Sequence, residues 1–484
     1  MIVFLSQERP SPFKKFVNYE VEVDPDQDDK AKEILLCTLS RPHMRAFHCS
    51  WWAFFIAFFV WFAITPLLPT IQADLNLTKA DIWDSNIAGV AGTVLIRFLV
   101  GPLCDVYGPR IIFSVLLCTA SIPAALTGLV NTARGLNVLR LFIGFAGGTF
   151  VSCQYWTSRM FTKEVVGTAN GLAAGWGNLG AGVTQLIIGS ILLPLIELGA
   201  GGNASIAWRT VCIIPAVVCF VTGIVVYRIS DDAPKGTYRE LKAHGLFPKD
   251  LTVWSSFINV ASNPNAWIFF IQYACSFGVE LTMTNAAALY FQDQFGQSTA
   301  AAGAIASIFG WLNLFARGLG GFLSDWANYK WGMRGRLWAQ FICLFSEGVM
   351  VLVFANSSSL AGSIVALVFF SMLVQMTDGT NFAIVPYIDP PNMGSVCGIA
   401  GAGGNSGAVA FGFAFKLLPY KTAFLIMGCC IIGVSFTTIL VHIKGYRTLL
   451  WGKDLRVSPE TGEIIPAIES SSARGRDDVG HHGK

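Results

Sequence analysis

Long apolar stretches alternate with short polar ones over most of the chain. Each apolar stretch has the 20 or so residues that a helix needs to cross the roughly 30 Å hydrocarbon core of a bilayer. This pattern predicts twelve membrane-spanning helices, at residues 47–71, 82–104, 110–131, 135–158, 165–196, 208–229, 265–292, 299–324, 337–355, 360–388, 394–416 and 421–444. The longer polar segments then define a tail at 1–46, a six-helix bundle at 47–229, a central loop at 230–264, a second six-helix bundle at 265–444 and a tail at 445–484.

Composition agrees with an all-α integral membrane protein. Apolar residues make up 53% of the 484 residues and charged residues only 13%, about half the charge of a typical soluble protein. This excludes a soluble enzyme, a nucleic-acid-binding domain and a disordered scaffold. The net charge of +3 is too small to imply a polyanionic partner. The twelve cysteines show no CxxC or Cys/His ligand spacing, so we expect no metal, no disulfide framework and no cofactor.

Positive charge predicts the orientation. With both termini in the cytoplasm, about 25 of the 33 Lys and Arg residues fall in the tails and the loops on the cytoplasmic side. Three N-glycosylation sequons, which start at Asn76, Asn203 and Asn356, all fall in predicted outer loops. The N-terminus shows no secretory signal, because the first apolar block begins near Phe47 and is too long. We therefore expect a multi-pass plasma-membrane protein with cytoplasmic ends.

Two motifs repeat in the same order in the two bundles. Residues Arg97 to Asp105 read RFLVGPLCD, and residues Arg317 to Asp325 read RGLGGFLSD, with the same Arg-x3-Gly-x3-Asp spacing. The segments GTANGLAAGWGNLG, from residue 167, and GSVCGIAGAGGNSG, from residue 394, share their Gly-x3-Gly and Gly-Asn-x-Gly positions. Two homologous halves with parallel topology follow, related by an axis along the membrane normal.

The paired arginines of the first motif are the leading candidates for function. A central Arg costs roughly 2.5–3.5 kcal/mol on insertion scales, so it rarely faces lipid or lacks a partner. A structural ion pair within one half is one interpretation. However, Arg97 and Arg317 are equivalent across the pseudo-axis, and no acidic residue lies within a turn of either. We therefore expect two unneutralised guanidinium groups beside one cavity, a geometry that suits a planar oxyanion.

The second motif places an amide at the same point of each repeat. Small-residue packing explains most of its glycines, but not Asn178 and Asn405. A buried Asn needs hydrogen-bond partners. We expect these amides to donate to a bound anion, with backbone capping at a glycine-loosened turn as the alternative.

Two carboxylates lie inside predicted spans. Glu280 shares a helix face with Tyr273 and Phe277, at i, i+4 and i+7 spacing, and Asp378 lies in QMTDGTNF. Intramembrane carboxylates are functional candidates, so each is a candidate proton carrier or a structural hydrogen-bonding group. Arg140, nearer the outer end of its helix, favours a structural role.

Asp105, Arg110 and Asp325 lie at cytoplasmic helix ends. A carboxylate there can meet Arg and helix termini and form a latch that opens during a transport cycle.

These motifs resemble those of the major facilitator superfamily, whose loop signature is similar to GPLCDVYGPR. More specifically, FVSCQYW, AAGWGNLGAGVTQ, SFGVEL, NLFARGLGGFLSD and GAGGNSG resemble the nitrate/nitrite porter family, above all the high-affinity nitrate transporters of plants, algae and fungi. The resemblance spans about residues 45–445. Two departures are ARGLGG, where many relatives have ARPAGG, and a central loop shorter than in typical fungal members.

The resemblance implies roles for single residues. Arg97 and Arg317 match the pair that clamps nitrate, and Asn178 and Tyr273 match hydrogen-bonding partners of the anion. Two further aromatic residues and an amide complete the implied site: Phe150, Phe277 and Asn405. The first two match the rings that sandwich the planar anion, and the third follows by symmetry.

We expect a carrier, not an enzyme, that imports nitrate and also nitrite by alternating access, coupled to protons. Importing an anion against a negative-inside potential costs roughly 2.3 kcal/mol per 100 mV, which favours symport. The alternatives are nitrate/nitrite exchange, transport of another small monovalent oxyanion, and a nitrate sensor with little flux. The acidic stretch Asp24 to Asp29 and the serines at 470–472 are expected to be disordered, with a regulatory role as the alternative.

Overall fold

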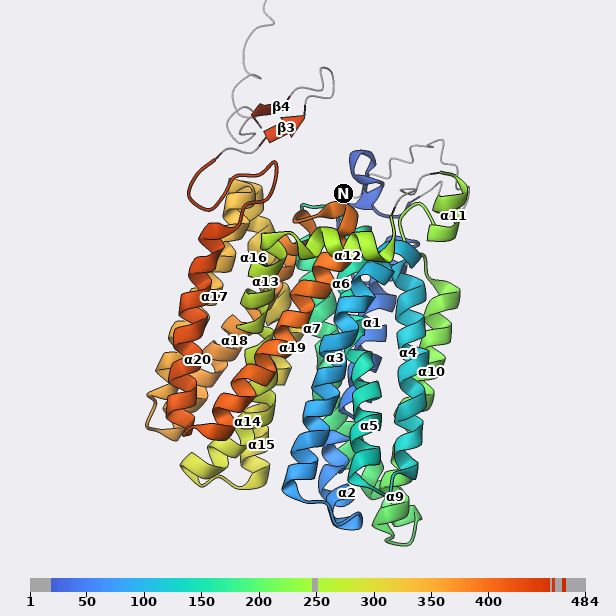
Figure 1. The fold of residues 1–484 in the computed structure, drawn as a ribbon, viewed down its shortest axis with the longest axis vertical. Coiled ribbons are helices and arrows are strands. Elements are labelled where there is room, and N and C mark those ends of the chain that lie inside the picture. The colour runs from blue at the N-terminus through green and yellow to red at the C-terminus, as the bar shows by residue number, and fades with distance from the viewer. Residues whose placement is uncertain (1–18, 246–250, 453–454, 458–463, 467–484) are drawn as a thin grey trace, which may run out of the picture.

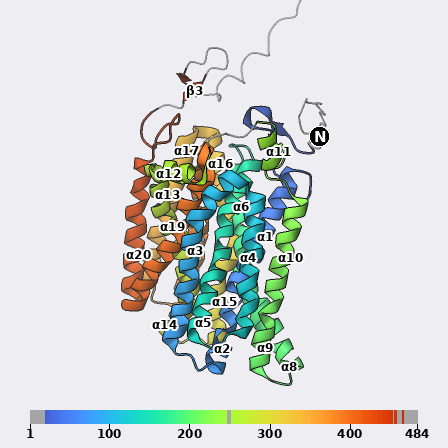
Figure 2. The same cartoon turned by 45° about the vertical axis from the view of Figure 1, so that its right-hand side comes forward.

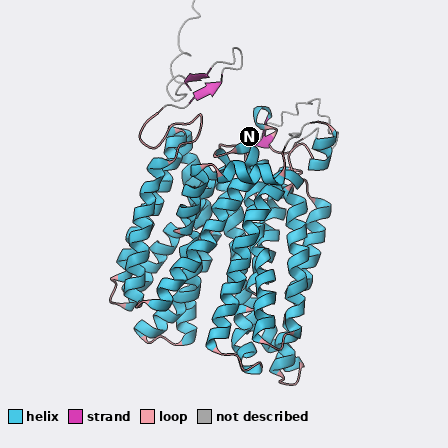
Figure 3. Cartoon of the chain, in the orientation of Figure 1, coloured by secondary structure: helices cyan, strands magenta, loops and turns pink. Residues whose placement is uncertain are grey.

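The protein is almost entirely helical, with its helices packed side by side in one elongated bundle (Figure 1, Figure 3). This computed structural model describes residues 19–245, 251–452, 455–457 and 464–466. The N-terminal segment, the central loop and the segment after 440 lie together at one end, which we call the terminal face (Figure 1). The opposite end, the distal face, carries the connections at 75–78, 200–203 and 356–359.

The first half contains six membrane-crossing stretches, most of them built from more than one helical element. They are α1 (His43–Phe62) with η3 (Thr65–Leu67) and α2 (Leu68–Asp74); α3 (Lys79–Tyr107); α4 (Pro109–Leu126) with η4 (Thr127–Leu129); α5 (Ala133–Ile143) with η5 (Gly144–Gly148) and α6 (Thr149–Met160); α7 (Val166–Thr184) with η6 (Gln185–Leu192) and α8 (Leu193–Gly199); and α9 (Ala204–Val211) with α10 (Ile213–Ile229).

The second half repeats this arrangement. Its stretches are α13 (Pro264–Ala274) with α14 (Phe277–Phe295); α15 (Thr299–Trp311) with η7 (Leu312–Leu314) and α16 (Ala316–Trp331); α17 (Met333–Ala355); α18 (Leu360–Ile384) with η8 (Val385–Tyr387); α19 (Met393–Leu417), which follows η9 (Pro390–Asn392); and α20 (Tyr420–Ser435) with η10 (Phe436–Leu440). Eleven stretches of the described chain are long and apolar enough to cross a membrane. The glycine-rich α19 is the twelfth, so the twelve-helix prediction agrees with the structure.

The central segment is more structured than a polar loop. Helices α11 (Tyr238–Ala243) and α12 (Val253–Ala261) form within it, each behind a Thr capping box. Helix α12 lies across the terminal face, where it contacts α3 and α19 (Figure 1).

The acidic N-terminal stretch is folded, so the expectation of disorder is wrong there. Strands β1 (Val23–Asp24) and β2 (Lys30–Ala31) form a hairpin around η2 (Pro25–Gln27). The carbonyl of Ala31 accepts a hydrogen bond from Thr162 N at 2.9 Å, and Lys30 Nζ donates to the carbonyl of Ser158 at 3.0 Å. These contacts hold the hairpin on the terminal end of α6. A second hairpin, β3 (Leu455–Val457) with β4 (Ile464–Pro466), follows α20, and the serines at 470–472 lie outside the described residues.

The two halves meet most closely along two symmetry-related helix pairs. Helix α3 packs on α19, and α7 packs on α16; α19 and α3 lie side by side in Figures 1 and 2. A Cβ added to Gly101 would lie 2.4 Å from the carbonyl oxygen of Gly394, and one added to Gly321 would lie 2.0 Å from that of Gly167. The repeated glycines are therefore what lets the backbones of the two halves touch.

Candidate functional site

Arg97 of α3 is a buried cation that has no carboxylate partner among the described residues. Its side chain is fully buried. Nε donates to the carbonyl of Gly147 at 3.0 Å, and Nη1 donates across the interface between the halves to the carbonyl of Gly401 at 2.5 Å. Nη2 has no hydrogen-bond partner in the described part of the chain. Arg97 therefore keeps both a full positive charge and a free donor at the centre of the protein.

Arg317 of α16 differs from its counterpart, because it is neutralised. Nη2 donates to Glu280 Oε2 at 2.7 Å and also to Asp378 Oδ2, while Nε donates to Gln375 Oε1 at 3.2 Å. The expectation of two unneutralised guanidinium groups is thus wrong for Arg317. The two carboxylates come from α14 and α18. The sequence-based expectation considered only acidic residues within one helical turn of Arg317, so it did not include partners on other helices.

Three stacked aromatic rings lie beside the two arginines. Phe150, Tyr273 and Phe277 stack nearly parallel, with centroid separations of 5.3–6.1 Å and interplanar angles of 4–14°. Arg97 Cζ lies 4.8 Å from the Phe150 centroid and 5.5 Å from the Phe277 centroid, and Arg317 Cζ lies 5.6 Å from the Phe277 centroid. The Phe277 ring is therefore in cation–π contact with both guanidinium groups.

The two repeated amides lie in the same region. With the Asn178 amide oriented to match its surroundings, its oxygen accepts hydrogen bonds from Arg317 Nη1 and Nη2 at 3.0 and 3.1 Å. Asn405 is fully buried, and neither its amide nitrogen nor its oxygen has a partner in the described structure. The buried hydroxyl of Tyr273 is also unpartnered there. Unsatisfied buried groups of this kind carry a free-energy cost that a ligand can remove.

The charges of this centre balance without a ligand. Arg97 and Arg317 contribute two positive charges, and Glu280 and Asp378 contribute two negative charges when ionised. Glu280 is further held by Asn313, whose Nδ2 donates to Oε1 at 2.7 Å. An anion that enters next to Arg97 therefore leaves the buried centre with one excess negative charge. A proton on one carboxylate would restore neutrality.

The terminal face is closed by two equivalent carboxylates. Asp105 accepts hydrogen bonds from the backbone N–H groups of Gly394 and Ser395, at 2.7 and 2.9 Å, where α19 begins. Asp325 accepts from the N–H groups of Gly167 and Thr168, at 3.0 and 2.6 Å, where α7 begins. Each carboxylate thus binds the N-terminus of a helix from the other half, where the helix dipole stabilises a negative charge.

The arginines near these two carboxylates do not all have the partners that the sequence predicted. Arg336 pairs with Asp325 at 2.8 Å. Arg110 does not meet Asp105; it pairs with Asp232, with Nε and Oδ2 3.6 Å apart, in the segment after α10. Burial raises the pKa of Asp232 to about 6, although Arg110 opposes this shift. Arg110 therefore ties the central segment to its own half.

A cavity of about 250 Å³ lies between the halves on the distal side of the arginine centre. Its lining includes Leu281 and Thr282, directly after Glu280, and the cationic side chains of Arg140 and Lys416. Arg140 donates to Asn86 Oδ1, so it has the structural bond expected for it, but it also faces this cavity. The described lining of this cavity therefore carries positive charge.

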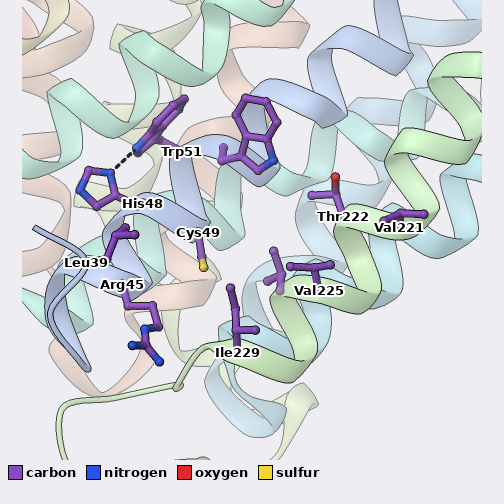
Figure 4. A pocket seen from close by; sticks show the side chains of 11 residues that line it. Leu39, Arg45, His48, Cys49, Trp51, Val221, Thr222, Val225 and Ile229 are labelled. Atoms are coloured by element: carbon purple, nitrogen blue, oxygen red, sulfur yellow. Dashed lines mark hydrogen bonds between the residues drawn. The ribbon is translucent and has the colours of Figure 1, made fainter.

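A second cavity lies elsewhere and has a different character. It has a volume of about 720 Å³ and lies between α1 and α10 near the terminal face (Figure 4). Arg45 and His48 are its ionisable basic side chains, and His48 accepts a hydrogen bond from Trp51 Nε1 at 3.0 Å. Most of the lining is apolar, and Trp52 and Val221 remain exposed on the outer surface of the bundle. This groove faces the surroundings of the first half and does not contact the arginine centre.

Sequence reasoning missed one carboxylate. Glu347 of α17 is fully buried, and both of its carboxylate oxygens lack a hydrogen-bond partner among the described residues. The criterion that selected Glu280 and Asp378, an acidic residue inside an apolar span, applies equally to Glu347. In the described part of the chain all twelve cysteines are free, and no group of three or more His, Cys, Asp and Glu residues could hold a metal ion.

Comparisons with known proteins agree with this architecture. The model of the Major Facilitator Superfamily matches residues 50–412. High affinity nitrate transporter 2.5 of Arabidopsis thaliana is 40% identical over 430 residues, covering 88% of this chain and 85% of that protein. Nitrate transporter 2.2 of Chlamydomonas reinhardtii is 37% identical over 385 residues, covering 79% and 75%.

Two further comparisons concern a less similar sequence and a solved structure. Nitrate/nitrite transporter NrtP of Nostoc punctiforme is 27% identical, covering 81% of this chain and 91% of that protein. Among solved structures, the proton:xylose symporter XylE matches with a TM-score of 0.61 at 14% identity, covering 81% of this chain and 94% of that one. With its twelve helices, two homologous halves and matching motifs, the chain is a membrane transporter and no enzyme; it belongs to the major facilitator superfamily and, within it, to the nitrate/nitrite porter family.

Proposed function

We propose that this protein imports nitrate, and also nitrite, by proton-coupled alternating access. The observation that carries the proposal is Arg97: a fully buried guanidinium with an unpartnered Nη2 and no carboxylate partner in the described structure. Nitrate has one charge and three coplanar acceptor oxygens, which suits a guanidinium fork flanked by flat rings. The names of the relatives at 37–40% identity support the choice of this oxyanion.

In this proposal Arg97 binds the anion first. Phe150, Tyr273 and Phe277 surround it, with the Tyr273 hydroxyl and the Asn405 amide as donors. Arg317, oriented by Asn178, becomes a second clamp when one of its carboxylates takes up a proton and releases it. Coupling follows from charge balance, because an added anion in a desolvated neutral centre is costly unless a proton accompanies it.

The structure corresponds to a conformation closed at the terminal face. We infer that Asp105 and Asp325 act as latches that release α19 and α7 when the halves rock toward the inward-open state. Charge-assisted hydrogen bonds to helix termini are strong enough to hold one state and few enough to be broken within a cycle.

We place the terminal face in the cytoplasm and the protein in the plasma membrane. The distribution of Lys and Arg supports this orientation. The three sequon asparagines, Asn76, Asn203 and Asn356, are exposed at the distal face, which is outside the cell in this orientation.

Labelled-nitrate uptake into proteoliposomes tests the proposal. With an inside-alkaline pH gradient, we expect accumulation that collapses when a protonophore is added. Accumulation that requires internal nitrite and ignores the gradient would indicate an exchanger. If another monovalent oxyanion inhibits labelled-nitrate uptake more strongly than unlabelled nitrate does, that oxyanion is the preferred substrate. Nitrate binding without measurable flux would indicate a sensor.

A further inference from the structure

The cavity of about 250 Å³ between the halves, which we call the distal cavity, has two basic side chains in its described lining and no acidic one. Arg140 of α5 lines it from the first half, and Lys416, in the last turn of α19, lines it from the second. A cavity lined by one sign of charge attracts small ions of the opposite sign. Its volume is several times the roughly 30 Å³ that one water molecule occupies in the liquid, so a small oxyanion fits together with some of its hydration water.

Arg140 is a buried cation with a donor that no described group uses. Its exposed fraction is 5%. Its Nη2 donates to Asn86 Oδ1, while Nε has no hydrogen-bond partner, and the residue has no carboxylate partner, in the described part of the chain. The bond to Asn86 fixes the guanidinium and leaves Nε for a ligand. A buried charge without a counter-charge is costly, so this position favours a bound anion.

Gly89 of α3 leaves space in front of this donor. A Cβ added to Gly89 would lie 3.9 Å from Arg140 Nε and 3.7 Å from Trp61 Nε1. Both nitrogens carry an N–H group, so two donors lie around one point that the missing side chain leaves open. All three residues line the distal cavity. These distances are ordinary contacts, so packing does not require glycine here, in contrast to Gly101.

We propose that the distal cavity is a second binding site for a small monovalent oxyanion, an inference that rests on the proposed nitrate transport for its role. Arg140 Nε and Trp61 Nε1 donate to the oxygens of the anion, and Lys416 adds positive charge from the other half. The site holds nitrate on the distal side of the arginine centre, so the local concentration of the anion is high when that centre becomes accessible. Arg97 remains the site from which the anion is transported.

Residue-resolved chemical labelling tests this site without transport. The purified protein in detergent is treated with a lysine-specific reagent at constant ionic strength, with either nitrate or the bulky anion gluconate, and mass spectrometry follows the labelling of Lys416. A bound anion stabilises the unreactive ammonium form, so we expect nitrate to slow this labelling about threefold or more. Lys421 is exposed on the same face but outside the described lining, and its labelling should not change.

Two variants separate this site from the arginine centre and one serves as a control. Arg97→Lys should keep the nitrate protection of Lys416, because Arg97 takes no part in the distal cavity. Gly89→Ala should remove the protection, because the added methyl group covers Arg140 Nε at a distance that leaves the helix packing intact. Gly303→Ala, where an added Cβ meets nothing within 4 Å, should retain it.

Equal labelling of Lys416 in nitrate and in gluconate would refute the second site. Loss of protection in Arg97→Lys would assign the effect to the arginine centre, and full protection in Gly89→Ala would contradict binding at Arg140. In proteoliposomes, Gly89→Ala should lower kcat/KM for nitrate uptake about threefold or more; an unchanged kcat/KM would overturn the role of the site in transport. Absence of nitrate uptake by the unaltered protein would instead refute the proposed function, while the labelling would still decide whether the distal cavity binds the anion.

Discussion

Arg317 Nη2 lies 2.7 Å from Glu280 Oε2, in an ion pair that joins α16 to α14 inside the second half. Its symmetry counterpart in the first half, Arg97, has no such pair in the described structure. The two arginines at equivalent positions of the repeat therefore differ in their charge environment: Arg97 keeps an unpartnered Nη2, and Arg317 is held by two carboxylates.

Arg97→Lys should raise the KM for nitrate about 10- to 100-fold. A Lys ammonium keeps the charge but loses the planar fork, and a hydrogen bond to a charged group contributes about 1.5–3 kcal/mol. Labelled-nitrate uptake at varied concentration measures the effect. Arg45→Lys, on the outer groove of the first half, is the matched control, and an unchanged KM in Arg97→Lys would contradict the anion site.

Glu280→Gln should weaken the dependence of uptake on external pH. The neutral amide removes one carboxylate from Arg317, so anion binding no longer requires a proton at this position. We expect nitrate binding to persist at alkaline pH, where the unaltered protein loses it. Nitrate uptake and proton flux recorded together between about pH 5.5 and 8.5 test this prediction. If proton flux in Glu280→Gln still follows nitrate uptake as in the unaltered protein, Glu280 is not the coupling residue.

Asp105→Asn should open the terminal face more often. The charge-assisted hydrogen bonds to Gly394 and Ser395 weaken by about 1.5–3 kcal/mol, which shifts the population toward the inward-open state about 10- to 100-fold. Faster hydrogen–deuterium exchange at the start of α19 is the expected signal. Asp84→Asn, an exposed position on the same helix α3, should leave that exchange unchanged.

Gly101→Ala should impair closure between α3 and α19. The added Cβ would lie 2.4 Å from the carbonyl oxygen of Gly394, so the helices must move apart. We expect nitrate uptake to fall severalfold while the protein remains folded. Gly182→Ala in α7, where an added Cβ meets nothing within 4 Å, should be neutral or slightly stabilising because Ala favours a helix. Equal uptake by the two variants would show that this close approach does not matter.

The N-terminal hairpin should dock more firmly as the pH rises above neutrality. Burial, together with the nearby Arg159, lowers the pKa of Lys30 from 10.5 to about 7 in the folded protein. Between about pH 7 and 10 the undocked segment therefore binds more protons than the docked one, and docking gains stability as the pH rises. Below about pH 7 both forms are protonated, and the dependence disappears. Limited proteolysis of residues 19–33 at about pH 6.5 and 8.5 measures this, and Lys30→Met should remove the difference.

The sequence by itself determined the architecture, because the bilayer imposes a length and an apolarity on every span that can be read directly. The same constraint makes intramembrane charges conspicuous, so the amino-acid pattern alone identifies Arg97, Arg317, Glu280 and Asp378 as candidates. The repeated glycines likewise indicate where two halves approach.

Only the tertiary structure decided which of these charges meet. The partners of Arg317 come from α14 and α18, and Asp105 binds the start of α19, 289 residues further along the chain. Such pairings depend on how helices distant in sequence rotate against one another, which no spacing within one helix encodes. For the same reason Glu347 is informative only through its surroundings, where neither carboxylate oxygen has a hydrogen-bond partner among the described residues.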